Sequence, residues 1–143
     1  VAIGNPRIRK KIVERLQINK NISFPNIFDK DVIIDKTVTI GFGNIICKGS
    51  ILTTNLEIGN FNHINLNCTV GHDVQFHDYI TVYPGVNISG NVRINDCVEI
   101  GTGTKIIQGK EIVKETVIGA GSVVVKDIVE NGTYIGVPAK QMK

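Results

Sequence analysis

Residues 94–124 read INDCVE-IGTGTK-IIQGKE-IVKETV-IGAGSV-V, and an aliphatic residue opens each block of six. The same register extends back to Ile34 and forward to about Ile128 without an insertion. Sixteen successive positions of this register are aliphatic or Phe: Ile34, Ile40, Ile46, Leu52, Ile58, Ile64, Val70, Phe76, Val82, Ile88, Ile94, Ile100, Ile106, Ile112, Ile118 and Val124. Because only about half of the residues in an ordinary domain are apolar, chance alignment does not explain this run.

A period of six matches neither the helical period of 3.6 nor the strand period of two. It is typical of a short strand followed by a corner, repeated as a parallel β-helix. Three such sides close a triangular coil of about 18 residues, so the register predicts about five coils stacked about 4.8 Å apart. The general rule for parallel crossovers predicts a right-handed coil.

A second position, four residues after each aliphatic one, is mostly apolar or small and is also expected to face the core. Asn44, Asn62 and Lys110 interrupt this second column. The position directly after the aliphatic residue is expected to form the corner with positive φ, because Gly, Asn and Asp tolerate that conformation. That position holds Gly41, Gly59, Gly71, Gly101, Gly119, Asp35, Asn65 and Asn95.

Composition indicates a cytoplasmic protein without a strong affinity for nucleic acid or membranes. The net charge is +3 and 20% of residues are charged. No apolar run approaches the roughly 20 residues of a membrane span, and no signal-peptide pattern appears. Cys47, Cys68 and Cys97 show no CxxC spacing, which favours a reduced cytosolic setting. Cys68 falls in the second column and is expected to lie in the core.

The first residues predict a strand and a helix that precede the coils. Val1 to Gly4 is typical of the end of a buried strand, and Asn5-Pro6 of a helix start. Ile8, Ile12, Val13 and Leu16 predict an apolar face, opposite a basic face that either binds an anion or is simply solvated. The basic residues are Arg7, Arg9, Lys10 and Lys11. A chain that opens on a strand end is expected to continue a preceding βα unit. The predicted organisation is residues 1–20 as the remnant of that unit, 21–33 as connector, 34–128 as β-helix and 129–143 as tail.

Candidate chemistry centres on four polar residues near the middle of the repeat: His63, His72, Asp73 and His77. His72 and Asp73 lie between two inward positions and are expected to be exposed. A carboxylate beside an imidazole stabilises the charged ring, so His72 is a candidate general base near neutral pH, although a surface pair would look the same. A metal site built on His72 and His77 would need a third ligand one coil away from His72. The residues at those positions are Thr54 and Gly90, so no metal is expected.

These residues resemble the hexapeptide-repeat sugar acetyltransferases, in the branch of sialic acid O-acetyltransferase and UDP-4-amino-sugar N-acetyltransferase. The resemblance rests on the repeats, on residues 70–73, 84–86, 101–103 and 118–124, and on the tail 136–140. Residues 2–12 also resemble the last strand and helix of the N-terminal nucleotide-sugar-binding subdomain in that family. The family's glycine-rich nucleotide loop has no counterpart in this sequence.

The resemblance implies a left-handed β-helix in a homotrimer, with acetyl-CoA as co-substrate in the groove between adjacent prisms. It implies that His72 is the general base, that Asp73 raises its basicity, and that a backbone N–H around Gly90 stabilises the oxyanion. The positions that match acetyl-CoA contacts are Thr81, Gly90, Thr102 and Ala120, and less directly Pro138, Ala139 and Lys140. Gly4 and Arg7 match retained contacts to the nucleotide-sugar substrate.

The favoured function is therefore N-acetylation of a nucleotide-linked amino-deoxysugar. O-acetylation of a sugar such as sialic acid is the nearest alternative, because the acceptor pocket is largely outside this sequence. A γ-class carbonic anhydrase on the same prism would need the third metal-binding histidine that is missing here. A non-catalytic trimeric scaffold would not need His72.

Overall fold

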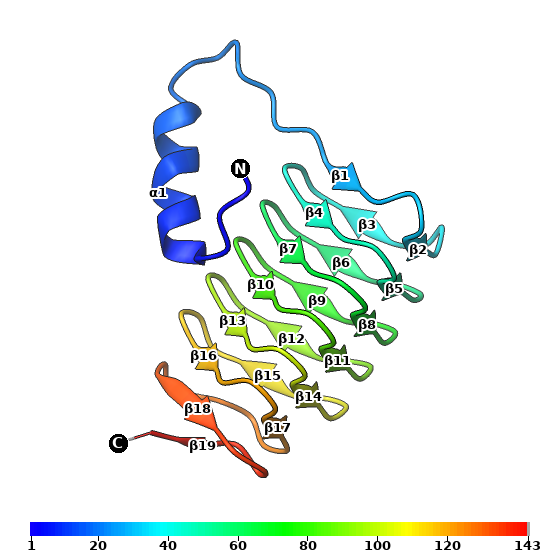
Figure 1. The fold of residues 1–143 in the computed structure, drawn as a ribbon, viewed down its shortest axis with the longest axis vertical. Coiled ribbons are helices and arrows are strands. Elements are labelled where there is room, and N and C mark those ends of the chain that lie inside the picture. Colours follow the sequence, from blue (N-terminus) through cyan, green and yellow to red (C-terminus); the bar gives the residue numbers. More distant parts are fainter. Residues whose placement is uncertain (143) are drawn as a thin grey trace.

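The computed structural model describes residues 1–142, which form a triangular prism of stacked two-residue strands with one helix beside it (Figure 1). From β1 to β17, successive strands fall on three sheets in rotation, so each of these strands pairs in parallel with the strand one coil away. One of the three sheets contains six strands, one for each coil. The repeat therefore predicts the architecture correctly but is one coil short, because Phe28 adds a coil before Ile34.

The strands of each sheet are as follows. Sheet A consists of β1 (Ile27–Phe28), β4 (Ile45–Ile46), β7 (His63–Ile64), β10 (Thr81–Val82), β13 (Glu99–Ile100), β16 (Val117–Ile118), β18 (Thr133–Ile135) and the antiparallel β19 (Lys140–Gln141). Sheet B consists of β2 (Ile33–Ile34), β5 (Ile51–Leu52), β8 (Thr69–Val70), β11 (Asn87–Ile88), β14 (Lys105–Ile106) and β17 (Val123–Val124). Sheet C consists of β3 (Thr39–Ile40), β6 (Glu57–Ile58), β9 (Gln75–Phe76), β12 (Arg93–Ile94) and β15 (Glu111–Ile112). Strand pairing thus begins at Ile27, inside the range expected to be a connector.

The second residue of each strand points into the prism, as the register predicts. From Ile46 to Val124 every residue of the six-residue register is buried, whereas Ile34 on the first coil is 37% exposed. Most of the second column is buried too, including Leu56 and Cys68. Each such side chain contributes roughly 1.5–3 kcal/mol on burial, so the two columns hold the coils together.

The corners turn at a different residue from the one expected. Positive φ occurs three residues after the aliphatic position, at Asn55, Phe61, Asn67, Asp73, Tyr79, Asn91, Cys97 and Glu115 and at glycines such as Gly85 and Gly109. The glycines directly after the aliphatic position do not have positive φ, so that prediction was wrong. Gly71 and Gly101 are needed because the next coil approaches closely. A Cβ on Gly71 would stand 2.6 Å from the backbone N of Gly90, and one on Gly101 would stand 2.5 Å from that of Ala120.

The two asparagines that interrupt the second column form a buried ladder at the corner between sheets C and A. The Asn62 backbone N–H donates to Asn44 Oδ1 at 2.8 Å, and the Ile80 N–H donates to Asn62 Oδ1 at 2.7 Å. The Asn62 side-chain amide also donates to the His77 carbonyl at 2.9 Å. Because their polar atoms are paired within the stack, these residues are compatible with the core.

Helix α1 (Pro6–Leu16) lies beside sheet A (Figure 1) and begins where Asn5-Pro6 predicts. Asn5 Oδ1 accepts a hydrogen bond from the Ile8 N–H at 3.0 Å and caps the helix. The buried face of the helix is Pro6, Arg9 and Val13, whereas Ile8 is 52% exposed. The predicted apolar face is therefore only partly correct. Within the described residues, α1 is too short and too polar to cross a bilayer.

Residues 1–4 form no strand, contrary to expectation, and three of their four carbonyl groups accept hydrogen bonds from side chains instead. Arg9, which was expected on the basic outer face, is fully buried beneath them. Its guanidinium donates to the carbonyls of Ile3 (2.6 Å), Gly4 (3.0 Å), Phe61 (2.9 Å) and Ile80 (3.1 Å). Arg9 thus ties the N-terminal segment and α1 to two coils of the prism.

Candidate active site

His72 and Asp73 occupy the corner between β8 on sheet B and β9 on sheet C. His72 Nδ1 lies 2.7 Å from Asp73 Oδ2, and the two side chains are 54% and 53% exposed. Asp73 has a φ of 58° and stands in the corner position where the neighbouring coils have Asn55 and Asn91. The corner therefore accepts Asp for conformational reasons, and this position also places the carboxylate against the ring.

The contact with Asp73 determines which nitrogen of His72 can act as a base. Hydrogen bonds from His72 and then from Asn55 lower the pKa of Asp73 below its usual value, so the carboxylate is ionised and only accepts. His72 Nδ1 must then carry the proton and donate it to Asp73, which leaves Nε2 with a free lone pair. Among residues 1–142, Nε2 has no hydrogen-bond partner. The ring is thus prepared to receive a proton at Nε2.

Gly90, one coil further on, lies directly against this ring. A Cβ on Gly90 would stand 2.5 Å from His72 Nε2 and 2.6 Å from Cε1, so any larger residue would displace the imidazole. The Gly90 carbonyl accepts from the Gly109 N–H at 3.0 Å. Its own N–H has no acceptor within the described part of the chain. A free backbone donor therefore lies close to the candidate base.

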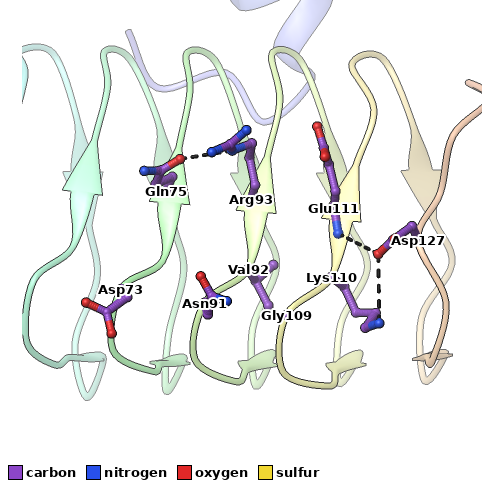
Figure 2. Close-up of a pocket in the computed structure, with 9 residues that line it drawn as sticks. All are labelled: Asp73, Gln75, Asn91, Val92, Arg93, Gly109, Lys110, Glu111 and Asp127. Carbon is purple, nitrogen blue, oxygen red and sulfur yellow. Dashed lines mark hydrogen bonds and ion pairs between the residues drawn. The ribbon is translucent and has the colours of Figure 1, made fainter.

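A polar groove with a cavity volume of ≈ 230 Å³ begins at Asp73 and runs along sheet C (Figure 2). Its lining comes from two ladders in which residues repeat every coil. Outward residues of three successive strands form one ladder: Gln75, Arg93 and Glu111. The corner residues Asp73, Asn91, Gly109 and Asp127 form the other. Because Gly109 has no side chain and a Cβ there would meet nothing within 4 Å, the groove stays open at this coil.

Three charged side chains of the groove, Arg93, Asp127 and Lys110, are held by contacts within it. Arg93 Nε donates to Gln75 Oε1 at 2.9 Å, and the Glu111 backbone N–H donates to Asp127 Oδ1 at 3.0 Å. Lys110 Nζ lies 3.9 Å from Asp127 Oδ1. In the sequence Lys110 interrupts the second column, and this interruption is a local signal for the groove.

The fold separates the three histidines near the middle of the repeat, so only His72 and Asp73 of the four candidate residues come together. His63 on β7 is buried beneath the N-terminal segment, where its Nε2 lies 3.0 Å from the Val1 carbonyl oxygen and its Nδ1 lies 3.4 Å from Arg9 Nη1. His77 is on the corner at the other end of β9 from His72 and lies 3.8 Å from Asp96. Among residues 1–142, no three His, Cys, Asp or Glu side chains converge as metal ligands.

Burial and the nearby Arg9 charge keep His63 neutral. Desolvation is the main cause that lowers the pKa of His63 to about 4, and the Arg9 charge adds to it. Arg9 can only donate, so His63 Nδ1 accepts and the ring proton on Nε2 is donated to the Val1 carbonyl. Burial also lowers the pKa of Arg9 to about 10, which still leaves the guanidinium charged at neutral pH.

Thr81 lies in the same buried network and does not face a possible cofactor groove. Its side chain is fully buried, and its hydroxyl donates to the Gly4 carbonyl at 2.5 Å and accepts from Arg9 Nη1 at 3.0 Å. The expected acetyl-CoA contact at Thr81 is therefore not available, because the N-terminal segment covers this position. Gly4 is exposed on that segment, and Arg7 is exposed on the first turn of α1, where its Nη2 donates to the Glu115 carbonyl at 3.1 Å.

Thr102 and Ala120 are exposed together on the corner between sheets A and B, one coil apart. The C-terminal tail reaches the same corner, where the Ala139 N–H donates to the Val123 carbonyl at 2.8 Å and Gly136 bonds to Ser122 and Val123. His72 and Gly90 lie on the opposite edge of sheet B. Within one chain, His72 and Gly90 thus lie at one corner of the prism, whereas Thr102, Ala120 and the tail lie at another.

Comparison with known proteins gives a consistent set of relatives, although no protein-family model matches the chain. The chain is 38% identical over 125 residues to GDP-perosamine N-acetyltransferase of Escherichia coli O157:H7, an alignment that covers 85% of this chain and 54% of the relative. The chain thus spans about half the length of this curated relative.

Two solved structures cover nearly the whole chain. WeeI from Acinetobacter baumannii AYE superimposes with a TM-score of 0.93 at 34% identity, covering 97% of this chain and 68% of that one. A variant of perosamine N-acetyltransferase from Caulobacter crescentus, in complex with CoA and GDP-perosamine, superimposes with a TM-score of 0.94 at 29% identity. That match covers 98% of this chain and 66% of the neighbour. The fold is the left-handed parallel β-helix, as the resemblance implied and contrary to the general crossover rule.

Proposed function

Because this chain belongs to the hexapeptide-repeat sugar acetyltransferases, we propose that it transfers an acetyl group from acetyl-CoA to the amino group of a nucleotide-linked amino-deoxysugar. The observation that carries this proposal is the geometry at His72. The ring is fixed by Asp73 through Nδ1, it is seated on Gly90, and Nε2 is free. The named activity and ligands of the relatives support the choice of an amino sugar as acceptor.

The residues at this corner fit the proton transfers of an acyl transfer. His72 Nε2 takes a proton from the acceptor amine as the amine nitrogen forms a bond to the thioester carbonyl carbon. The ionised Asp73 stabilises the imidazolium that results. The N–H of Gly90, which has no acceptor among the described residues, would donate to the oxygen that becomes negative in the tetrahedral intermediate. When the carbon–sulfur bond breaks, the imidazolium returns its proton to the departing thiolate.

A complete site is proposed to form between copies of the chain in a homotrimer. His72 and Gly90 lie on one edge of sheet B, whereas Thr102, Ala120 and the tail lie on the other edge. One acetyl-CoA molecule can contact both sets if the two edges belong to adjacent prisms. In this arrangement Gly90 of one subunit and Thr102 and Ala120 of its neighbour contact acetyl-CoA, and Gly4 and Arg7 face the nucleotide sugar.

Mass spectrometry of acetyl transfer tests the proposal directly. The protein is incubated with acetyl-CoA and a panel of nucleotide amino sugars, with GDP-perosamine as the first acceptor and sialic acid as the O-acetylation comparison. We expect a product carrying one added acetyl group on nitrogen, and we expect His72→Ala to lower kcat by roughly 10²–10⁴-fold while the fold is retained. Absence of transfer to every acceptor, or unchanged turnover by His72→Ala, would reject the proposal.

A further inference from the structure

The polar groove on sheet C has a composition suited to a sugar ring. Its lining supplies hydrogen-bond donors from Arg93, Asn91 and Gln75 and acceptors from Asp73 and Glu111, and Val92 is its one apolar residue. A hydroxylated ring presents donors and acceptors around its whole edge and matches such a mixed lining. The acyl arm and the adenine of acetyl-CoA would find almost no apolar surface here.

Several donors in the groove have no partner in the described chain. Arg93 uses Nε for Gln75 Oε1, which leaves both terminal nitrogens of its guanidinium and the Gln75 amide N–H groups available. The Asn91 side chain makes no hydrogen bond within residues 1–142. The Arg93–Gln75 contact holds two planar groups side by side, so they can bind neighbouring hydroxyl groups with little loss of side-chain freedom.

Charge distinguishes an amino sugar from a phosphate in this groove. The lining contains three carboxylates, Asp73, Glu111 and Asp127, against two cations, Arg93 and Lys110. This balance disfavours an anion and favours a neutral ring or one that carries an ammonium group. The volume of ≈ 230 Å³ is below the roughly 300–1,000 Å³ of pockets for larger ligands, so it suits one sugar ring and not a nucleotide.

The groove also begins at the catalytic corner. Asp73 lines its end and bonds to His72, and Figure 2 shows Asn91 and Gln75 near Asp73 on the neighbouring coil and strand. We propose that this groove is the subsite for the acceptor's amino-deoxysugar ring, in which Arg93, Gln75 and Asn91 bind the hydroxyl groups and direct the amine toward His72. This inference rests on the proposed acetyltransferase function and assigns three residues that determine acceptor specificity.

The test separates the two substrates kinetically. Arg93→Gln removes the charged donor but keeps a planar polar side chain. We expect its KM for GDP-perosamine to rise about tenfold while its KM for acetyl-CoA stays within about twofold of the parent value. Lys36→Gln is the matched control, because Lys36 is an exposed cation at the corner that leads into sheet C, three coils before Arg93 and outside the groove. The control should leave both KM values unchanged.

Direct binding provides a readout that does not require turnover. Calorimetric titration of GDP-perosamine into the parent protein and into Arg93→Gln should show an affinity about tenfold weaker for the variant. If Arg93→Gln matches the parent in binding and in KM, or if only the KM for acetyl-CoA rises, the groove is not the acceptor subsite. If the parent protein transfers no acetyl group but Arg93→Gln still binds GDP-perosamine more weakly than the parent, the proposed acetyltransferase function is rejected and the sugar subsite is supported.

Discussion

The imidazole of His72 rests on Gly90, with Nε2 only 2.5 Å from the place where a Cβ on Gly90 would stand. Gly90 is not in a positive-φ conformation, so the backbone itself would tolerate alanine there. We predict that Gly90→Ala displaces the ring and lowers kcat on the order of 100-fold, because small misplacements of a catalytic group cost that much. Steady-state acetyl transfer measures the effect, and circular dichroism checks that the coils still form.

Ser89→Ala is the control for this prediction, since Ser89 is the exposed residue immediately before Gly90. It should leave kcat within about twofold of the parent, because its side chain makes no hydrogen bond to the ring among the described residues. If Gly90→Ala had the same kcat as the parent, the close contact between Gly90 and the ring would not matter for catalysis. The base would then have to act from another position.

Asp73→Asn tests whether the carboxylate has a catalytic role beyond shaping the corner. Asn occupies the same corner position at residues 55 and 91 with φ near that of Asp73, so the variant should fold with parent stability. We predict that kcat falls about tenfold, less than for His72→Ala, because the imidazolium loses its charged partner while an acceptor oxygen remains. A loss of Tm without a change in kcat would instead show that Asp73 has only a conformational role.

The sequence predicts the parts of this molecule that depend on periodicity. The six-residue register identifies the prism and its inward residues, and the position of His72 between two inward valines predicts an exposed base. Contacts between distant segments could not be read in this way. Arg9 looked like one of four surface cations because nothing local shows that the carbonyls of Ile3 and Phe61 surround it.

The corner glycines illustrate the same limit. Local preference predicted positive φ directly after each aliphatic residue, whereas the stack places it two residues later and uses Gly71 and Gly101 for close approach between coils. Likewise, the groove on sheet C is made of residues about one coil apart, such as Gln75 and Arg93, whose pairing appears only when strands β9 and β12 are adjacent.

Arg9 is predicted to be the largest single contributor to the attachment of the N-terminal segment. Arg9→Leu would leave the carbonyls of Ile3, Gly4, Phe61 and Ile80 without their donor, and we expect the free energy of unfolding to fall by about 3 kcal/mol. Chemical denaturation measures this loss. Arg15→Leu, on the exposed face of the same helix, should change stability by less than about 0.5 kcal/mol. Equal effects of the two substitutions would contradict the assigned role of Arg9.

His63 should make folding stability depend on pH in the acidic range. The pKa of His63 is lowered from 6.5 to about 4 in the folded protein, so between these values the unfolded chain binds a proton that the folded chain does not. Its contribution to stability is therefore complete above pH 6.5, is lost as the pH falls toward 4, and amounts to about 3 kcal/mol in total. Denaturant unfolding at several pH values measures the slope.

Carboxylates titrate in the same pH range. Comparing the pH dependence of unfolding in the parent and in His63→Asn separates the contribution of His63 from theirs. Asn can still accept from Arg9 but cannot be protonated, so the free energy of unfolding of the variant should fall less steeply between pH 6.5 and 4. The same measurement on His77→Asn, whose ring is about half exposed on another corner of the prism, gives the response to replacing a histidine outside the buried network. Parallel slopes for the parent and His63→Asn would mean that His63 becomes protonated in the folded protein as readily as in the unfolded chain, and that the Arg9 contact does not keep it neutral.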